Sequence, residues 1–200
     1  MKNKKSNSEI TYSIALTEEL CIKAKNLCHD VYLRVGYIDE PYPDRIIPND
    51  LEHASTYIVA VDNDEVVGTL RLTAGPPFTT LKIWKDNLYA DCNKLINDIL
   101  EGRAFEIGAL AVNKEYSSLK ISQGLYMSAY NYCAMSGLEY GIISMDARAL
   151  RTLEMNGWKA IRIGEPKMYF GSLTVPAIMP IIIQPNVSQM YLKTANNLAA

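Results

Sequence analysis

The amino-acid sequence predicts an α/β domain in which helices cover both faces of a mixed sheet. Strand-like and helix-like segments alternate along most of the chain, and one pair of strand-like segments is joined by a short turn alone. Parallel strands need a helical crossover whereas a hairpin joins antiparallel strands, so both kinds of pairing are expected. With 200 residues, 48% hydrophobic and 21% charged, the composition is that of a globular protein. We assign residues 1–9 to a flexible N-terminal tail and residues 10–200 to one domain.

The first half of the chain begins with a strand and a helix whose ends carry capping residues. Thr17 has the side-chain oxygen that an N-cap needs and two acidic residues follow it, while Gly36 ends the helical pattern. The next loop holds three prolines and is long enough to cover a site. Asp62-Asn63-Asp64 is typical of a hairpin turn. The expected elements are a strand over 10–16, a helix over 18–34, a loop over 39–48, paired strands over 56–61 and 66–73, and one or two short helices within 79–101, outside the core.

The second half contains an apolar strand that two residues interrupt. Glu106 and Gly108 break a run otherwise made of Ala, Phe, Ile, Leu and Val. Further on, Asp146 can cap a helix and Gly157 provides its left-handed exit. The expected elements are a strand over 104–112, a helix through 121–133 that stops at Gly137, a strand over 139–145, a helix over 146–155, strands over 158–163 and 173–183, and a tail helix over 188–198.

Composition and residue spacing exclude several functional classes. The net charge of −2 argues against a general nucleic-acid binder. The most apolar stretch, residues 175–183, contains two prolines and is too short to cross a bilayer, and no signal-peptide pattern follows the basic N-terminus. The four cysteines show no Cys-x-x-Cys spacing, and neither histidine belongs to a metal-ligand pattern. We therefore expect a soluble cytoplasmic protein that binds no metal and no nucleic acid and does not span a membrane.

Three segments, in the same order along the chain, resemble the signatures of acyl-homoserine-lactone synthases. They are Gly-Thr-Leu-Arg-Leu at 68–72, Phe-Glu-Ile-Gly at 105–108, and Asn-Gly-Trp-Lys-Ala-Ile-Arg-Ile-Gly-Glu-Pro at 156–166. The order of elements over residues 10–183 also resembles the GNAT acyltransferase fold. The resemblance implies a GNAT-type central sheet, mixed and mostly antiparallel, flanked by helices.

Other positions depart from those synthases. Cys28 and Ile38 stand where the synthases have Arg and Trp, and Gly108-Ala109 replaces their Ser-Arg. This variant pattern is similar to that of the N-acyl amino acid synthases recovered from environmental DNA. The likeness implies an enzyme that transfers a long-chain fatty acyl group from the phosphopantetheine of acyl carrier protein to an amino acid such as tyrosine, with no bound cofactor.

Acyl transfer to an amine requires a base, stabilisation of an oxyanion and a leaving thiolate. Glu106 is the candidate base because a carboxylate within an apolar strand is desolvated and becomes a better proton acceptor; alternatively, it pairs with Arg71. Gly108 allows a substrate to come close, and the N–H groups near Leu110 or Ala111 are candidates for the oxyanion site. A simple β-bulge at Gly108 is the alternative.

Substrate binding requires a cation for the amino-acid carboxylate and an anion site for the acyl donor. Arg71, between two leucines, is the candidate cation and Arg34 the second candidate, unless Arg71 points into solvent.

The helix that follows the 104–112 strand is the candidate anion site. N–H groups at its start can bind one phosphate, unless the segment is only a capped helix. The candidate acyl and pantetheine residues are Val112, Lys120, Ile121, Ser122 and Gln123. Docking of an acidic carrier requires a positive surface, and residues 113–200 hold 8 basic and 5 acidic residues. The candidate docking residues are Lys114, Arg148, Arg151 and Lys159, unless these are scattered solvated charges.

Two other functions fit the sequence. One is a GNAT acetyltransferase that uses acetyl-coenzyme A on a small amine, and the other is a non-catalytic module that binds fatty acyl groups or their carrier. The segment over 117–124 lacks the glycine pair of a coenzyme A pyrophosphate loop, which disfavours the acetyltransferase. Five methionines either line an acyl tunnel or belong to the ordinary core: Met127, Met135, Met145, Met155 and Met168.

Overall fold

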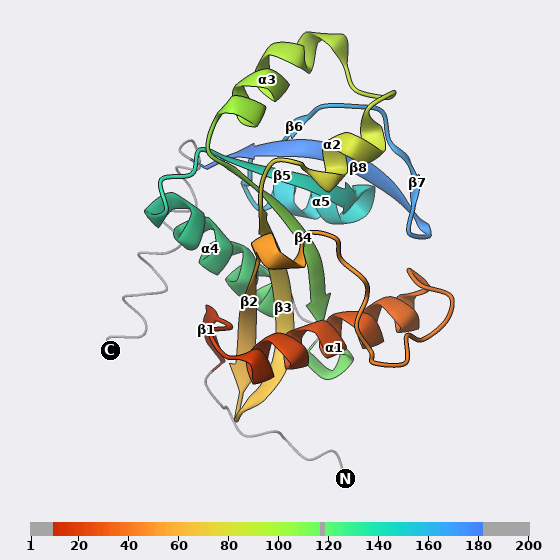
Figure 1. Cartoon of the computed structure of the whole chain (residues 1–200), viewed down its shortest axis with the longest axis vertical. Coiled ribbons are helices and arrows are strands. Elements are labelled where there is room, and N and C mark those ends of the chain that lie inside the picture. The colour runs from red at the N-terminus through yellow and green to blue at the C-terminus, as the bar shows by residue number, and fades with distance from the viewer. Residues whose placement is uncertain (1–9, 117–118, 182–200) are drawn as a thin grey trace. The chain divides into compact units, whose positions relative to one another are not determined.

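A computed structural model describes residues 10–116 and 119–181, in two compact units. Of the described residues, unit 1 comprises 10–71, 109–116 and 119–129, and unit 2 comprises 72–108 and 130–181. Strands β3 (Glu65–Ala74) and β4 (Ala104–Val112) contribute residues to both units. The hydrogen-bonded strand order is β1-β2-β3-β4-β5-β8-β6, with β7 paired to β8 (Figure 1). The sheet is mixed, as predicted, because β4 and β5 are parallel while β1 with β2 and β5 with β8 are antiparallel.

Unit 1 contains β1 (Thr11–Ile14), α1 (Glu18–Val35) and β2 (Ser55–Asp62) besides its part of β3. Thr17 caps α1 by accepting a hydrogen bond from the Leu20 N–H, and Gly36 ends the helix with φ +78°. Figure 1 shows α1 lying across β2, and Ala24 packs there against Tyr57 and Val59. The two predicted helix boundaries are therefore confirmed.

Close packing in unit 1 depends on two glycines. A Cβ on Gly124 of α4 (Leu119–Met135) would lie 2.2 Å from the Tyr12 ring, and one on Gly68 would lie 2.8 Å from Ile121. A larger residue at either position would have to displace its neighbour. The hairpin between β2 and β3 turns at Asn63 and Asp64, which both have positive φ, as a two-residue turn of this hand requires.

Unit 2 contains helices that the sequence placed outside the core. The expectation of short helices is confirmed by α2 (Thr79–Trp84) and α3 (Asn93–Glu101), but their exclusion from the core is wrong. Trp84 and Ile99 are fully buried, and Ile99 packs with Phe78, Ile142 and other strand residues. Each helix is short and buries only one apolar face, and mostly polar residues separate the two helices. The sequence pattern therefore gives little sign that either helix packs on the core.

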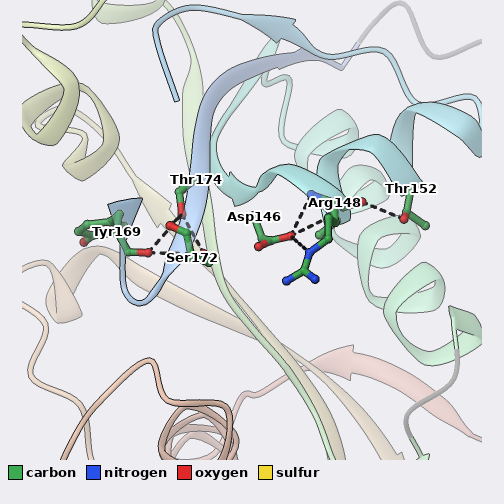
Figure 2. Close-up of polar contacts among 7 residues, drawn as sticks. Asp146, Arg148, Thr152, Tyr169, Ser172 and Thr174 are labelled. Carbon is green, nitrogen blue, oxygen red and sulfur yellow. Dashed lines mark hydrogen bonds and ion pairs between the residues drawn. The ribbon is translucent and has the colours of Figure 1, made fainter. Parts of the chain in front are cut away.

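The other helix of unit 2, α5 (Ala147–Met155), begins where β5 (Tyr140–Asp146) ends. Asp146 Oδ1 accepts hydrogen bonds from the N–H groups of Arg148 at 2.9 Å and Ala149 at 3.2 Å, so the predicted cap is confirmed (Figure 2). The Thr152 hydroxyl donates to the Arg148 carbonyl one turn earlier. Gly157 leaves the helix with φ +88°, also as predicted.

The C-terminal strands differ from the expectation. The strand predicted over 158–163 is only β6 (Ile161–Arg162), because the Trp158 N–H bonds back to the Leu153 carbonyl and closes the end of α5. An unexpected strand, β7 (Lys167–Tyr169), forms a hairpin with β8 (Ser172–Pro180). Figure 2 shows Ser172 and Thr174 hydrogen-bonded to each other and to the Tyr169 carbonyl at this hairpin.

Several expectations concern side-chain exposure or lie outside the described residues. Met135, Met155 and Met168 are 90%, 79% and 68% exposed, so these three line no interior tunnel. The tail over 1–9 and the helix over 188–198 lie outside the described residues, and the assignment of residues 10–200 to one domain stays a prediction. Within residues 10–116 and 119–181, no helix has both the length and the apolar character needed to cross a bilayer.

Candidate active site

Arg71 lies on β3 among uncharged side chains of unit 1. Its Nε is buried and has no hydrogen-bond partner, and no ion pair joins it to a carboxylate within the described residues. Cys28, Tyr32 and Tyr57 all interact electrostatically with its guanidinium. A buried N–H donor without a partner is costly unless an acceptor arrives. The alternative of an arginine turned wholly into solvent does not fit this burial.

The groups around Arg71 remain neutral. Burial raises the pKa of the Cys28 thiol to about 12, although the Arg71 cation and a hydrogen bond with Tyr32 partly offset the effect. Burial also raises the pKa of the Tyr32 hydroxyl and that of the Tyr57 hydroxyl well above their ordinary values. The positive charge of Arg71 is therefore not cancelled by these neighbours at neutral pH.

The proline-rich loop after α1 is tied to that helix at two adjacent residues. The His29 Nε2 accepts a hydrogen bond from the Tyr42 N–H at 3.0 Å, so its Nδ1 carries the proton and donates to Asp30 Oδ1, also at 3.0 Å. Arg45 in turn donates two hydrogen bonds to the Asp30 carboxylate. Farther along the loop, Ile47 packs beside Cys28. The loop therefore covers residues that adjoin Arg71, in keeping with the expectation that it covers a site.

We expect the contacts of Asp30 to stabilise the folded protein at neutral pH and to lose this effect in strong acid. Hydrogen bonds from Arg45 lower the pKa of Asp30 despite some burial, so the folded state favours the ionised carboxylate. This contribution is fully present above the ordinary Asp pKa of about 3.9 and disappears as pH falls through the lower folded pKa. Asp30→Asn should melt a few degrees below the unmodified protein between pH 6 and 8, on the order expected for a half-exposed pair. The two melting curves should converge as pH falls through the lowered pKa of Asp30. A constant difference at every pH would contradict the assignment.

Glu106 lies in unit 2 and binds the start of α2. Its Oε1 accepts hydrogen bonds from the Thr80 N–H at 2.7 Å and the Thr80 hydroxyl at 2.6 Å, and its Oε2 accepts one from the Thr79 N–H at 2.7 Å. The carboxylate is buried, as the sequence indicated. Its hydrogen-bond partners are these two threonines rather than the Arg71 that the sequence suggested. An anion on unpaired helix N–H groups satisfies donors that the helix itself cannot.

Strand β4 changes its pairing immediately after Glu106. Its parallel register with β5 runs from Ala104 opposite Tyr140 to Ile107 opposite Ile143 and stops there. Ala109 then has φ +48°, a left-handed conformation that side chains rarely adopt within a strand. An irregularity is therefore present beside Gly108, and the residue with the unusual backbone conformation is Ala109, one position later. A left-handed residue within a strand turns the backbone N–H groups that follow it away from the regular ladder.

The remaining candidates occupy separate places in the two units. Ala111 is buried beside Val31, Ile121 is buried in the first turn of α4, and Leu110 and Val112 are half-buried. Arg34 is exposed in the last turn of α1. The exposed basic candidates are Lys114 and Lys120 in unit 1 and Arg148, Arg151 and Lys159 in unit 2. Among residues 10–116 and 119–181, no group of three His, Cys, Asp or Glu side chains is arranged to hold a metal ion.

Comparison with protein families matches residues 23–180 to the N-acyl amino acid synthase FeeM. The chain belongs to the FeeM family of N-acyl amino acid synthases. It is therefore an N-acyltransferase. The match covers β2, β3 and β4, which hold Arg71 and Glu106. No curated protein sequence matches the chain significantly.

Solved structures confirm the fold of this synthase. FeeM, an N-acyl amino acid synthase from uncultured soil microbes, has a TM-score of 0.65 and 14% identity, over 88% of this chain and 93% of that one. The acyl-homoserine-lactone synthase LasI has a TM-score of 0.69 and 14% identity, over 87% and 91%. BjaI, a coenzyme A-dependent acyl-homoserine lactone synthase solved with S-adenosylmethionine and isopentyl-coenzyme A, has a TM-score of 0.64 and 16% identity, over 87% and 83%. The GNAT-type, mostly antiparallel sheet flanked by helices is thus confirmed.

Sequence reasoning missed Tyr57, which interacts electrostatically with Arg71. The Tyr57 hydroxyl donates to Glu52 Oε2 at 2.9 Å and also interacts with the Arg71 guanidinium. Tyr57 appeared to be an ordinary apolar residue of the first hairpin strand. A tyrosine at a buried strand position requires a partner for its hydroxyl, and that requirement is the signal that points to it.

Proposed function

We propose that this synthase transfers a long-chain fatty acyl group from acyl carrier protein to the amino group of a free α-amino acid, with tyrosine as the preferred acceptor. The single observation that supports the amino-acid acceptor is the half-buried Arg71, whose buried Nε has no hydrogen-bond partner and whose interacting neighbours are neutral. Guanidinium binds carboxylate in a bidentate, charge-assisted geometry, so an amino acid supplies the anion that Arg71 lacks. The choice of tyrosine rests on the family resemblance.

The proposed reaction forms an amide and releases a thiol. The amino-acid nitrogen attacks the thioester carbonyl carbon, the C–S bond breaks, and the pantetheine thiolate takes up a proton. Glu106 is the proposed acceptor of the amine proton, through Oε2, which accepts only the Thr79 N–H bond. Backbone N–H groups at Leu110 or Ala111, which follow the left-handed Ala109, are the proposed donors to the oxyanion, with Gly108 leaving room for the thioester.

The proposed donor is acyl carrier protein, which is acidic. The exposed cations at Lys114, Arg148, Arg151 and Lys159 support docking of an acidic partner. Amides at Lys120, Ile121, Ser122 and Gln123 open α4 and are proposed to bind the phosphate of phosphopantetheine, beside Val112. All four cysteines are free, which supports a reducing compartment such as the cytoplasm. A coenzyme A thioester is the second candidate donor, favoured by the structural likeness to coenzyme A-dependent BjaI.

One reaction series tests the proposal. The protein is incubated with palmitoyl-acyl carrier protein, palmitoyl-coenzyme A or acetyl-coenzyme A, each with tyrosine or with tyramine, and products are measured by mass spectrometry. We expect N-palmitoyltyrosine from the carrier-bound donor and at least a tenfold slower reaction of tyramine, because tyramine lacks the carboxylate. Equal rates with tyrosine and tyramine would overturn the amino-acid assignment. Turnover of acetyl-coenzyme A alone would favour the acetyltransferase alternative.

A further inference from the structure

Thr69, on β3, carries a fully buried hydroxyl without a hydrogen-bond partner. The residue is 0% exposed, and its Oγ1 is bonded to no other group. Among the described residues, three buried side-chain polar atoms lack a partner, and all three belong to unit 1: Asn26 Oδ1, Thr69 Oγ1 and Arg71 Nε. Burying an unpaired hydroxyl is unfavourable, and a valine would fill the same space without that cost. Packing alone therefore does not explain the hydroxyl at this position.

Thr69 and Arg71 lie on the same face of β3. Side chains alternate between the two faces of a strand, so positions two apart point the same way. Gly68 faces α4, because a Cβ on it would lie 2.8 Å from Ile121 and 3.1 Å from Leu125. Thr69 and Arg71 therefore point to the opposite face, with Cα atoms about 6.6 Å apart along the strand.

The chemistry of these two groups defines what can join them. They do not bond to each other, although a hydroxyl oxygen can accept from a guanidinium N–H. The Nε–H only donates, the hydroxyl can donate, and the guanidinium is positive. A negatively charged group with two acceptor oxygens satisfies both donors. A carboxylate that accepts hydrogen bonds of about 2.8 Å on each side can bridge donors at this spacing.

We infer that the Thr69 hydroxyl is a second donor, beside Arg71, to the carboxylate of the amino-acid acceptor. The inference rests on the proposed function, in which Arg71 binds that carboxylate. Arg71 supplies the positive charge, and the Thr69 hydroxyl fixes the direction of the carboxylate, so that the α-amino group is presented in one orientation. Both donor atoms are covered in the described structure, so the acceptor displaces part of their cover when it binds.

Thr69→Val tests the inference, because valine keeps the branched shape and removes only the hydroxyl. We expect KM for tyrosine to rise about tenfold, since a hydrogen bond to a charged group is lost. KM for palmitoyl-acyl carrier protein and kcat/KM for tyramine should stay within twofold, because neither involves the acceptor carboxylate. The melting temperature should stay the same or rise, since the hydroxyl has no partner to lose. Thr69→Ser keeps the hydroxyl and should retain the KM of the unmodified protein for tyrosine.

Thr174→Val, in unit 2, is the matched control. Thr174 is also buried, but its hydroxyl is bonded to the Ser172 hydroxyl at 3.1 Å and to the Tyr169 carbonyl at 3.3 Å. We expect this variant to melt at a lower temperature and to keep the KM for tyrosine. The two variants should thus show opposite effects, one on acceptor binding and the other on stability.

The possible results separate the inference from the proposed function. If the unmodified protein prefers tyrosine over tyramine and folded Thr69→Val keeps the KM for tyrosine, the inference is overturned and the proposed function stands. An equal loss of kcat/KM for tyrosine and for tyramine in Thr69→Val would overturn the inference as well, because the effect would not depend on the carboxylate. If the unmodified protein shows no preference for tyrosine, the proposed function fails first, and the inference fails with it.

Discussion

Arg71→Gln is expected to lower kcat/KM for the amino-acid acceptor by about two orders of magnitude. A bidentate bond between guanidinium and carboxylate is worth about 3 kcal/mol, and every 1.4 kcal/mol is a factor of ten. The fold should survive, because the Nε of Arg71 has no partner to lose within the described structure. Steady-state kinetics with tyrosine varied at saturating palmitoyl-acyl carrier protein measures the effect.

Two comparisons make the Arg71 prediction specific. Arg103→Gln makes the same chemical change at a side chain that is 69% exposed. Arg103 forms only a long ion pair with Glu139, at 3.9 Å, so this variant should leave kcat/KM unchanged. The preference for tyrosine over tyramine should also disappear in Arg71→Gln, because the group that senses the carboxylate is gone. If Arg71→Gln kept that preference, the carboxylate would have to bind elsewhere.

Glu106→Gln is expected to lose stability and turnover together. The carboxylate accepts all three hydrogen bonds from Thr79 and Thr80, whereas an amide has one acceptor oxygen and leaves a donor facing its NH₂ group. An unsatisfied buried donor costs about 2–3 kcal/mol, which for a chain of this size lowers the melting temperature by about 5–10 °C. Loss of a general base lowers kcat by at least about a hundredfold. Calorimetry and turnover at 15 °C, where the variant remains folded, measure the two effects separately.

Thr80→Val is the control that separates the two roles of Glu106. It removes one hydroxyl donor, leaves the Thr80 N–H and the carboxylate in place, and should cost about 1 kcal/mol without reducing kcat. Full turnover of folded Glu106→Gln would show that Glu106 only caps α2 and that another group accepts the amine proton. An unchanged melting temperature would instead contradict the capping role.

Local signals in the sequence were sufficient for most elements of the fold. Thr17 and Gly36 marked both ends of α1, and Asp146 marked the start of α5, because capping depends on residues within one turn of the helix end. The interruption at Gly108 likewise indicated the irregularity that the structure places at Ala109. These features are determined by near neighbours in the chain and can be read from it directly.

Partners distant in the sequence could not be read in this way. Glu106 was singled out as a buried acid, but its partners Thr79 and Thr80 lie 27 and 26 residues away, and no pattern in the sequence connects them. The burial of Trp84, on a short helix between polar stretches, was missed for the same reason. Sequence patterns record which residues avoid water and do not record which residue fills the space beside them.

The sequence by itself determined most of the order of strands and helices and the family signature segments, and it singled out Arg71 and Glu106 as the candidate site residues. Only the tertiary structure decided that the Nε of Arg71 is buried without a hydrogen-bond partner, and that Glu106 binds the start of α2. The physical reason is that a charged side chain buried by folding takes its properties from the donors and acceptors that folding brings to it. Those groups come from strands and loops that are far apart in the sequence.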